Sequence, residues 1–256
     1  GLGDVYKRQS CNHDQGEVSA PGNEITITVS EFAAGKEIEL QASWVSEEGQ
    51  LLATNRLTLV CPQLPHGRPP LHVVDDGALT EALRSLHYPL VGPEQQPIWV
   101  SRQFTSACRR HVAQGGRLLL LATEDAQQLP FGHVKPRAGS SWQGDWATSF
   151  SWLRRDGPFA SLPGGPLLDM SFLPIMPTAV IAGLPAWLLR DHSWAGLAVG
   201  WLHKHVSLLA TMRHGLGRMV VTTFNLAPDV LAQDAVAQAL FAGALSLLAE
   251  ESDDPH

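Results

Sequence analysis

The feature that most constrains the fold is a short, unbroken apolar run, "RLLLLA", at residues 117–122. A strand with leucine at successive positions exposes neither face to water, which is typical of the centre of a parallel sheet that is covered on both sides. The preceding patterns fit this interpretation, since they predict strands at 71–74 and 97–100 and helices at 78–87 and 104–116. Strands that alternate with helices imply right-handed crossovers and a parallel sheet with helices on both faces.

Downstream of this region the patterns predict antiparallel strands and a closing helix. Strands are favoured at 195–203, 205–213 and 217–224, with the glycine-rich turn "RHGLGR" between the last two. Apolar residues at helical spacing predict an amphipathic terminal helix over 230–250. The stretch at 131–175 has little regular pattern and is long for a connection inside a compact domain, so we expect it to pack against another surface.

The N-terminal part has a different pattern, because its apolar residues alternate with polar ones. Half-buried strands are expected at 25–29, 38–44 and 51–59, with a hairpin connection at 46–50. Three such strands cannot enclose a core, so they are interpreted as the end of an incomplete β-sandwich with an unpaired edge. Residues 62–70, "PQLPHGRPP", are rich in proline and predict a stiff linker.

The first residues fit neither pattern. Residues 4–9, "DVYKRQ", resemble the in-frame translation of a transposon end used as a sequencing adapter, so residues 1–9 are excluded from the expected fold; a short native basic arm is the alternative. An adapter there would mean that the chain was clipped from a longer reading frame. The expected organisation is a non-native segment at 1–9, the end of a β-sandwich at 10–61, a linker at 62–70, an α/β domain at 71–250 and an acidic tail at 251–256.

Charge and cysteine content exclude several classes of function. The chain has 18 Lys and Arg against 25 Asp and Glu, a net charge of −7, so neither nucleic acid nor an anionic membrane is expected as a partner. No apolar run approaches the roughly 18 residues that span a bilayer. Cys11, Cys61 and Cys108 are an odd number without metal-ligand spacing, so no metal, cofactor or disulfide framework is predicted, and the compartment stays open.

The order of elements resembles the class I glutamine amidotransferase-like fold, an α/β fold with a flavodoxin-like sheet. The stretches "GDWATSFSWLRRDGPFASLPGGPLLD" at 144–169, "GWLHK" at 200–204 and "GLGRMVVTTF" at 215–224 are similar to the C-terminal amidotransferase-like region of some bacterial family-two glycoside hydrolases, the β-galactosidase and β-mannosidase group. The resemblance covers about residues 70–250. It implies a parent enzyme that hydrolyses β-glycosidic bonds with two glutamates in a catalytic barrel, and it implies that this barrel is the partner of the present region.

The carboxyl end of the strand at 117–122 is the position at which working glutaminases carry their nucleophile, in a Gly-x-Cys-x-Gly turn. The flanking glycines admit the close backbone, and an amide of the turn stabilises the oxyanion. Here the strand ends in Ala122, Thr123, Glu124, Asp125 and Ala126. Thr123 and Glu124 therefore mark a degenerate elbow, in which Thr123 is expected to cap a following helix, and no catalytic residue is predicted.

Cys108, the cysteine of the α/β region, has two interpretations. The positive charges of Arg109, Arg110 and His111 would lower the pKa of its thiol and make it a nucleophile. However, a helix interior does not present a thiol as a sharp turn does, and small buried cysteines are common in cores. The core position is the favoured interpretation.

Aromatic and charged residues gather in the irregular stretch. A strand there would place Trp146, Phe150 and Trp152 on one face. Aromatic faces beside carboxylates and guanidinium groups bind sugar rings, and tryptophan and arginine are also enriched at protein interfaces. The predicted carbohydrate or interdomain contact consists of Trp142, Asp145, Trp146, Trp152, Arg154 and Asp156. The favoured role is packing of this segment onto its own sheet or onto the missing catalytic barrel.

The favoured hypothesis is a noncatalytic accessory region of a bacterial glycoside hydrolase in carbohydrate metabolism. It would brace or shape the catalytic barrel, or support a homo-oligomer. One alternative is a carbohydrate-binding module that acts through Trp142, Trp146 and Trp152. The other is an amidohydrolase or amidotransferase that uses Cys108.

Overall fold

The computed structural model of the chain describes residues 6–11, 37–46, 48–60, 62, 67–122, 126–137, 149–199 and 204–249. Two compact units are present, Gly1–Gln63 and Leu64–His256, and each is described by itself. The boundary between them falls inside the proline-rich stretch at 62–70.

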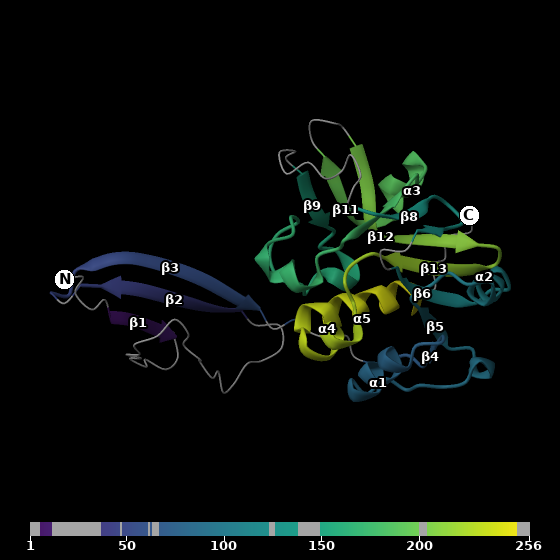
Figure 1. Cartoon of the computed structure of the whole chain (residues 1–256), viewed down its shortest axis with the longest axis horizontal. Helices are drawn as coiled ribbons and strands as arrows, with labels where there is room; N and C mark the ends of the chain where they lie inside the picture. Colours follow the sequence, from purple (N-terminus) through teal and green to yellow (C-terminus); the bar gives the residue numbers. More distant parts are fainter. Residues whose placement is uncertain are drawn as a thin grey trace. The chain divides into compact units, whose positions relative to one another are not determined.

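The first unit contains an antiparallel sheet in the order β1-β2-β3 (Figure 1). Its strands are β1 (Tyr6–Cys11), β2 (Glu37–Val45) and β3 (Leu51–Val60). The predicted hairpin between β2 and β3 is confirmed: Gly49, at a φ of +82°, donates its amide to the Ser46 carbonyl over 2.9 Å.

The register of β2 against β3 preserves the alternation in the sequence. Trp44 lies opposite Ala53, and on the other side of the sheet the Oγ atoms of Ser43 and Thr54 are 3.4 Å apart. The expected half-buried face is more open than the alternation predicts, because Trp44 is 47% and Leu51 is 60% exposed. Within the part of this unit that the structure describes, β3 pairs with β2 alone, which fits the rule that three strands cannot enclose a core.

The first residues of the chain were set apart from the expected fold, but residues 6–9 belong to β1 and pair with β2. The interpretation of residues 4–9 as a translated adapter stays a prediction. Strand pairing uses backbone groups, so a stretch without an apolar period can still add an edge strand. The strand predicted at 25–29 lies outside the described residues.

The second unit is built on a mixed sheet in the order β4-β5-β6-β13-β12-β10-β8-β7. Its first four strands are parallel, β12 is antiparallel to β13, and β11 pairs with both β12 and β9. The strands are β4 (Leu71–Val73), β5 (Ile98–Ser101), β6 (Arg117–Leu121), β7 (Gln127–Gln128), β8 (His133–Pro136), β9 (Ser149–Leu153), β10 (Ala179–Ala182), β11 (Ser193–Val199), β12 (Lys204–His214) and β13 (Gly217–Thr222).

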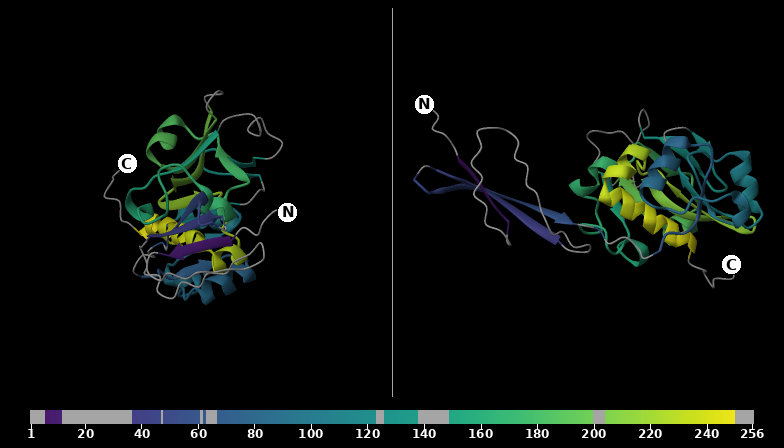
Figure 2. Two further views of the ribbon diagram at one scale, coloured as in Figure 1. Left: turned by 90° about the vertical axis from the view of Figure 1, so that its left-hand side faces the viewer. Right: turned by 90° about the horizontal axis from the view of Figure 1, so that it is seen from below.

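Helices cover both faces of this sheet, as predicted, so the second unit is a mixed α/β structure (Figure 2). One face packs against α1 (Gly77–Ser85), α4 (Pro228–Gln233), α5 (Ala235–Ala249) and the 3-10 segments η2 (Gly157–Phe159) and η3 (Met170–Ile175). The other face packs against α2 (Ser106–Ala113) and α3 (Ala186–Asp191). A short 3-10 segment, η1 (Pro93–Gln95), precedes β5.

The leucine run forms the centre of the sheet. Leu119 and Leu121 pack in the core under α5, while Leu118 and Leu120 pack in the core under α2, and all four are buried. The prediction of a central strand covered on both sides is therefore confirmed.

The closing helix differs from its prediction in two ways. It is interrupted at Asp234, whose backbone is extended and whose Oδ1 accepts the Ala237 amide over 2.7 Å, so that Asp234 caps α5. In addition, α5 is buried on most sides and is not amphipathic, because η2, η3 and α4 pack against it as well as the strands β6 and β13.

Some short elements escaped the sequence analysis. Strand β10 and helix α3 were not predicted, because four and six residues are too few to establish a period. Part of the irregular stretch at 131–175 is also ordered, since β8 and β9 both pair within the sheet. None of the helices among the described residues is long and apolar enough to cross a membrane.

A close backbone contact joins α2 to the turn between β12 and β13. A Cβ atom on Gly217 would lie 2.2 Å from the Val112 carbonyl oxygen and 2.3 Å from that of Gly116. Since both obstacles are backbone atoms, rotation of a side chain cannot relieve the clash.

We therefore expect Gly217→Ala to lower the free energy of unfolding by about 1–3 kcal/mol, the usual cost of overpacking. Gly77→Ala is the matched control, because a Cβ there meets nothing within 4 Å. This substitution should slightly raise the stability of helix α1. Denaturant unfolding followed by circular dichroism measures both changes. Equal stability of the two variants would contradict the close contact.

Candidate functional site

The carboxyl edge of the parallel strands is the candidate functional site. In open α/β sheets, ligands bind in the crevice outside the carboxyl ends of the strands. Here that edge carries two clefts, of about 450 and 410 Å³, and Arg102 lines both. The first is lined by Val74, Asp75, Asp76, Ser101, Arg102, Gln103 and Thr105, and the second includes Leu121, Ala122, Thr223 and Asn225.

Two adjacent aspartates follow β4 at this edge. Asp76 begins α1, because its Oδ1 accepts the Leu79 amide over 2.9 Å, and its Oδ2 lies 3.8 Å from Nη1 of Arg102. Asp75 is exposed and has a φ of +51°, a left-handed conformation that non-glycine residues rarely adopt. Such conformations often occur at binding sites.

The loop after β5 is held by side chains. The buried Ser101 hydroxyl donates to the Gln103 carbonyl over 2.8 Å. Gln127 accepts the Phe104 amide at Oε1 over 2.8 Å and donates from Nε2 to the Arg102 carbonyl over 3.1 Å. These polar groups satisfy backbone atoms of the loop, so their main role is to fix its conformation.

Thr123 and Glu124, the predicted degenerate elbow, lie outside the described residues. The helix that Thr123 was expected to cap is not formed, because the described residues that follow contain the strand β7. Strand β6 ends at Leu121, and the Ala122 amide that follows donates to the Thr222 carbonyl of β13 over 2.8 Å. In the described part of the chain, His, Cys, Asp and Glu side chains form no group of three that could hold a metal.

Cys108 lies in the core beneath α2. Its side chain is fully buried and packs in the same cluster as Leu118 and Leu120. The Thr105 hydroxyl caps α2 by accepting the Cys108 amide over 3.2 Å, and it also lies 3.3 Å from Sγ. A nucleophile must reach its substrate, so this geometry favours the core interpretation.

The described members of the predicted aromatic site are engaged within the protein. Trp152 packs closely against β11, where a Cβ on Gly196 would lie 2.6 Å from the Trp152 ring. The Arg154 guanidinium lies 4.2 Å above the Trp194 ring and pairs with Asp156, which holds the pKa of that carboxyl below its usual range. Trp142, Asp145 and Trp146 lie outside the described residues.

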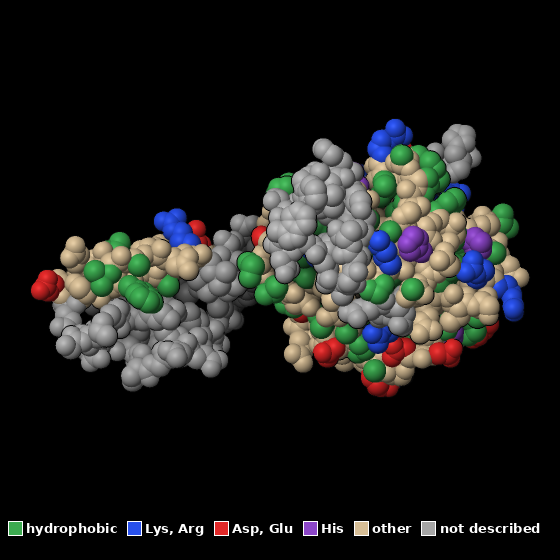
Figure 3. Space-filling model, turned by 45° about the horizontal axis from the view of Figure 1, so that its top comes forward, with side chains coloured by type: hydrophobic (Ala, Val, Ile, Leu, Met, Phe, Trp, Pro, Cys, Tyr) green, Lys and Arg blue, Asp and Glu red, His purple; other side chains and the backbone are tan. Residues whose placement is uncertain are grey.

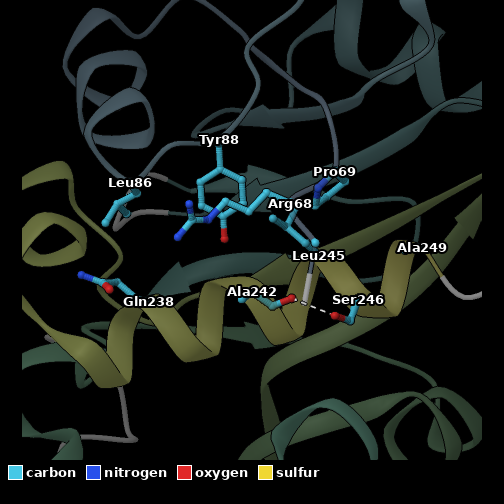
Figure 4. Close-up of a pocket in the computed structure, with 10 residues that line it drawn as sticks. Arg68, Pro69, Leu86, Tyr88, Gln238, Ala242, Leu245, Ser246 and Ala249 are labelled. Atoms are coloured by element: carbon cyan, nitrogen blue, oxygen red, sulfur yellow. Dashed lines mark hydrogen bonds between the residues drawn. The ribbon is translucent and has the colours of Figure 1, made fainter. Parts of the chain in front are cut away.

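A smaller cavity lies between α5 and the loop after α1 (Figure 4). Its walls include Arg68, Tyr88 and Gln238, and burial raises the pKa of Tyr88 to about 12. The volume of about 150 Å³ holds on the order of five water molecules. The cavity therefore has room for solvent or a small ion, and no sequence pattern indicated it.

Comparison with known proteins found no matching family model and no matching curated protein.

The capping role of Asp76 can be tested. We expect Asp76→Ala to lower the free energy of unfolding by about 1 kcal/mol, because the first turn of α1 loses its acceptor. The neighbouring Asp75→Asn should change stability by less than about 0.5 kcal/mol, since asparagine tolerates the same conformation. Thermal or denaturant unfolding measures both. If Asp76→Ala leaves the free energy of unfolding unchanged, the cap is not needed for stability.

The position of Cys108 predicts its reactivity. In the native protein we expect iodoacetamide to leave Cys108 unmodified under conditions that alkylate it fully in urea, because the native thiol is buried. Peptide mass spectrometry assigns the modified cysteine. Rapid alkylation of Cys108 in the native protein would contradict the buried position and would favour the nucleophile hypothesis.

Proposed function

We propose that this chain is a noncatalytic C-terminal accessory region of a bacterial family-two glycoside hydrolase. Its second unit would be an amidotransferase-like domain that braces or shapes the catalytic barrel of the same parent chain. The observation that carries this proposal is an exposed apolar surface beside β9.

This apolar surface consists of Phe150, Leu167, Met170 and Leu173, which are 48%, 52%, 75% and 61% exposed. The backbone holds its parts together, because Leu168 donates its amide to the Ser151 carbonyl and Trp152 pairs with Leu167. Exposed apolar patches of this kind mark sites of protein–protein contact. The four residues belong to the stretch 131–175, which is expected from the sequence to pack against another surface.

The strand order supports the amidotransferase-like part of the proposal. Leu71 of β4 pairs in parallel with Ile98 on one side and with Leu90 on the other. If Leu90 is the remnant of a second strand, the parallel order becomes 2-1-3-4-5, the flavodoxin-like order. In this order the two crossovers run in opposite directions across the sheet, because α1 leads from β4 to Leu90 and α2 leads from β5 to β6. If both crossovers are right-handed, α1 and α2 lie on opposite faces of the sheet, which agrees with their observed packing.

The two alternative functions have less support. A nucleophilic Cys108 conflicts with its burial, and a sugar platform at Trp152 and Arg154 conflicts with their packing against Gly196 and Trp194. The edge residues around Arg102 are committed to holding the loops, which suits a scaffold better than an enzyme.

The parentage has a direct test. Genomic DNA upstream of the Ser10 codon should encode, in frame, a barrel with two catalytic glutamates. The recombinant chain itself should turn over neither aryl β-glycosides nor glutamine. A stop codon immediately upstream, or turnover of either substrate, would overturn the proposal.

The apolar surface has a separate test. Leu173→Asp should weaken association of this chain with the polypeptide encoded upstream at least tenfold, because it places a charge in the contact. Leu216→Asp is the matched control, since Leu216 is 83% exposed on the distant β12–β13 turn. Both variants should keep the wild-type melting temperature. Equal affinities of the two variants would show that the surface is not the contact.

A further inference from the structure

The chain leaves two neighbouring strands of the parallel sheet toward opposite faces. The loop after β4 leads to α1, whose Leu83 packs in the core on one face, and the loop after β5 leads to α2, whose Val112 packs in the core on the other face. Open α/β sheets bind ligands at such a switch point, because the diverging loops leave a crevice between them. Every residue that lines the first cleft, of about 450 Å³, belongs to these two loops, at 74–76 and 101–105.

Arg102 connects this first cleft to the second, of about 410 Å³, at the ends of β6 and β13. Its Nη1 lies 3.8 Å from Oδ2 of Asp76, which makes an ion pair but is too long for a hydrogen bond. Within the described part of the chain the guanidinium has no other partner, and the Asp76 carboxylate uses only Oδ1 to cap α1. Both groups therefore keep unused hydrogen-bonding capacity at the cleft.

A hydroxyl group suits this pair, because it can accept from a guanidinium and donate to a carboxylate at the same time. Asp75 adds a second carboxylate to the cleft, and this exposed side chain has no hydrogen bond or ion pair within the described residues. Hydrogen bonds to ionised groups are stronger than those between neutral groups. Two carboxylates and one guanidinium can thus hold adjacent hydroxyls of a single ligand.

The charge of the first cleft disfavours an ionic ligand. Asp75 and Asp76 outnumber Arg102, so a phosphate or carboxylate group would meet a net negative charge, while Arg102 repels a cation. Most acidic side chains visible on the second unit in Figure 3 lie along its lower edge, the side on which Figure 1 draws α1 and β4. Among the described residues, no third His, Cys, Asp or Glu joins the two aspartates to hold a metal. A neutral polar ligand is therefore favoured.

The second cleft places an apolar wall beside these polar groups. Its lining includes the buried side chains of Leu121, Ala122, Phe224 and Leu226. Small-molecule sites combine a mainly apolar lining with a few polar groups that fix the orientation of the ligand, and they span about 300–1,000 Å³. A sugar ring matches both clefts, because it carries hydroxyls at its rim and C–H groups on its faces.

We infer that the two clefts form a binding site for a neutral sugar, with adjacent hydroxyls on Asp75, Asp76 and Arg102 and C–H groups toward the apolar lining of the second cleft. The hydroxyl chemistry fits any neutral polyol, and the choice of a sugar rests on the proposed function. Binding needs no catalytic group, so the site is compatible with a noncatalytic region. The contact with the barrel uses residues around β9, so each proposal can fail without the other.

Titration of the ¹⁵N-labelled whole chain, followed through its amide chemical shifts, tests the inference with galactose, mannose and glucose. We expect at least one of these sugars to cause saturable shifts at millimolar concentrations in amides of residues 74–76 and 101–105. Glycerol, glycine, putrescine and sodium phosphate are the comparison ligands, which represent an open-chain polyol, a zwitterion, a dication and an anion. Each should bind more weakly than the best sugar, because none combines neutral hydroxyls with a ring face.

Variants identify the groups that hold the sugar. Arg102→Met should weaken binding of the best sugar about tenfold or more, because a hydrogen bond to a charged group is lost. Asp75→Asn should weaken it about threefold or more, because a neutral amide oxygen accepts a weaker hydrogen bond than a carboxylate. Arg110→Met and Asp191→Asn are matched controls, since both residues are exposed and lie outside the two clefts. The amide spectrum of each variant shows directly whether it is folded.

The inference is wrong if none of the three sugars causes saturable shifts, or if Arg102→Met and Asp75→Asn bind the best sugar as tightly as the two controls. Tighter binding of phosphate, glycine or putrescine would overturn the ligand class, and equal binding of glycerol would overturn the choice of a sugar. If no sugar binds while Leu173→Asp still loses its upstream partner, the accessory role stands. If a sugar binds but no barrel is encoded upstream, the site stands and the parentage is wrong.

Discussion

The second unit depends on the burial of β6 on both sides. Successive leucines on this strand supply two separate cores, so neither layer of helices can pack without it. On one edge β6 pairs with β5, its neighbour in the sequence, and on the other with β13, which lies about a hundred residues later along the chain. The central pairing is therefore non-local, and folding must close a long loop before the sheet is complete. Every element between these strands has to be accommodated at an edge or as a covering layer.

The elements that the sequence predicted are those with enough residues to show a period. The strands around 71–74, 97–100 and 117–122 and both intervening helices follow from apolar spacing and from turn residues. Strand β10 and helix α3 escaped because they are short, and the end of the chain was misjudged because α5 is buried by tertiary packing on most sides. Local sequence cannot reveal how many neighbours will surround a helix.

The candidate sites show the same division. The core position of Cys108 follows from its place inside a helix, whereas an interface role for the segment around β9 stays a prediction. The pairing of Arg117 with Arg218 could not be predicted, because the two residues are neighbours only through strand register. Nor could the edge-to-face contact of Phe131 with Trp187, because Phe131 lies in the loop before β8 and Trp187 lies in α3.

The double pairing of β12 divides the sheet mechanically. Its C-terminal half is bonded to β13, whereas β11 and β9 form a ribbon that is fastened to the rest of the sheet through the N-terminal half of β12. Separating this ribbon would break the β11–β12 ladder and would also uncover Leu153, Ala195 and Leu197, which are buried in the same core as Leu119 and Leu121. The exposed Phe150 therefore projects from a strand pair whose opposite face is anchored in the interior of the unit.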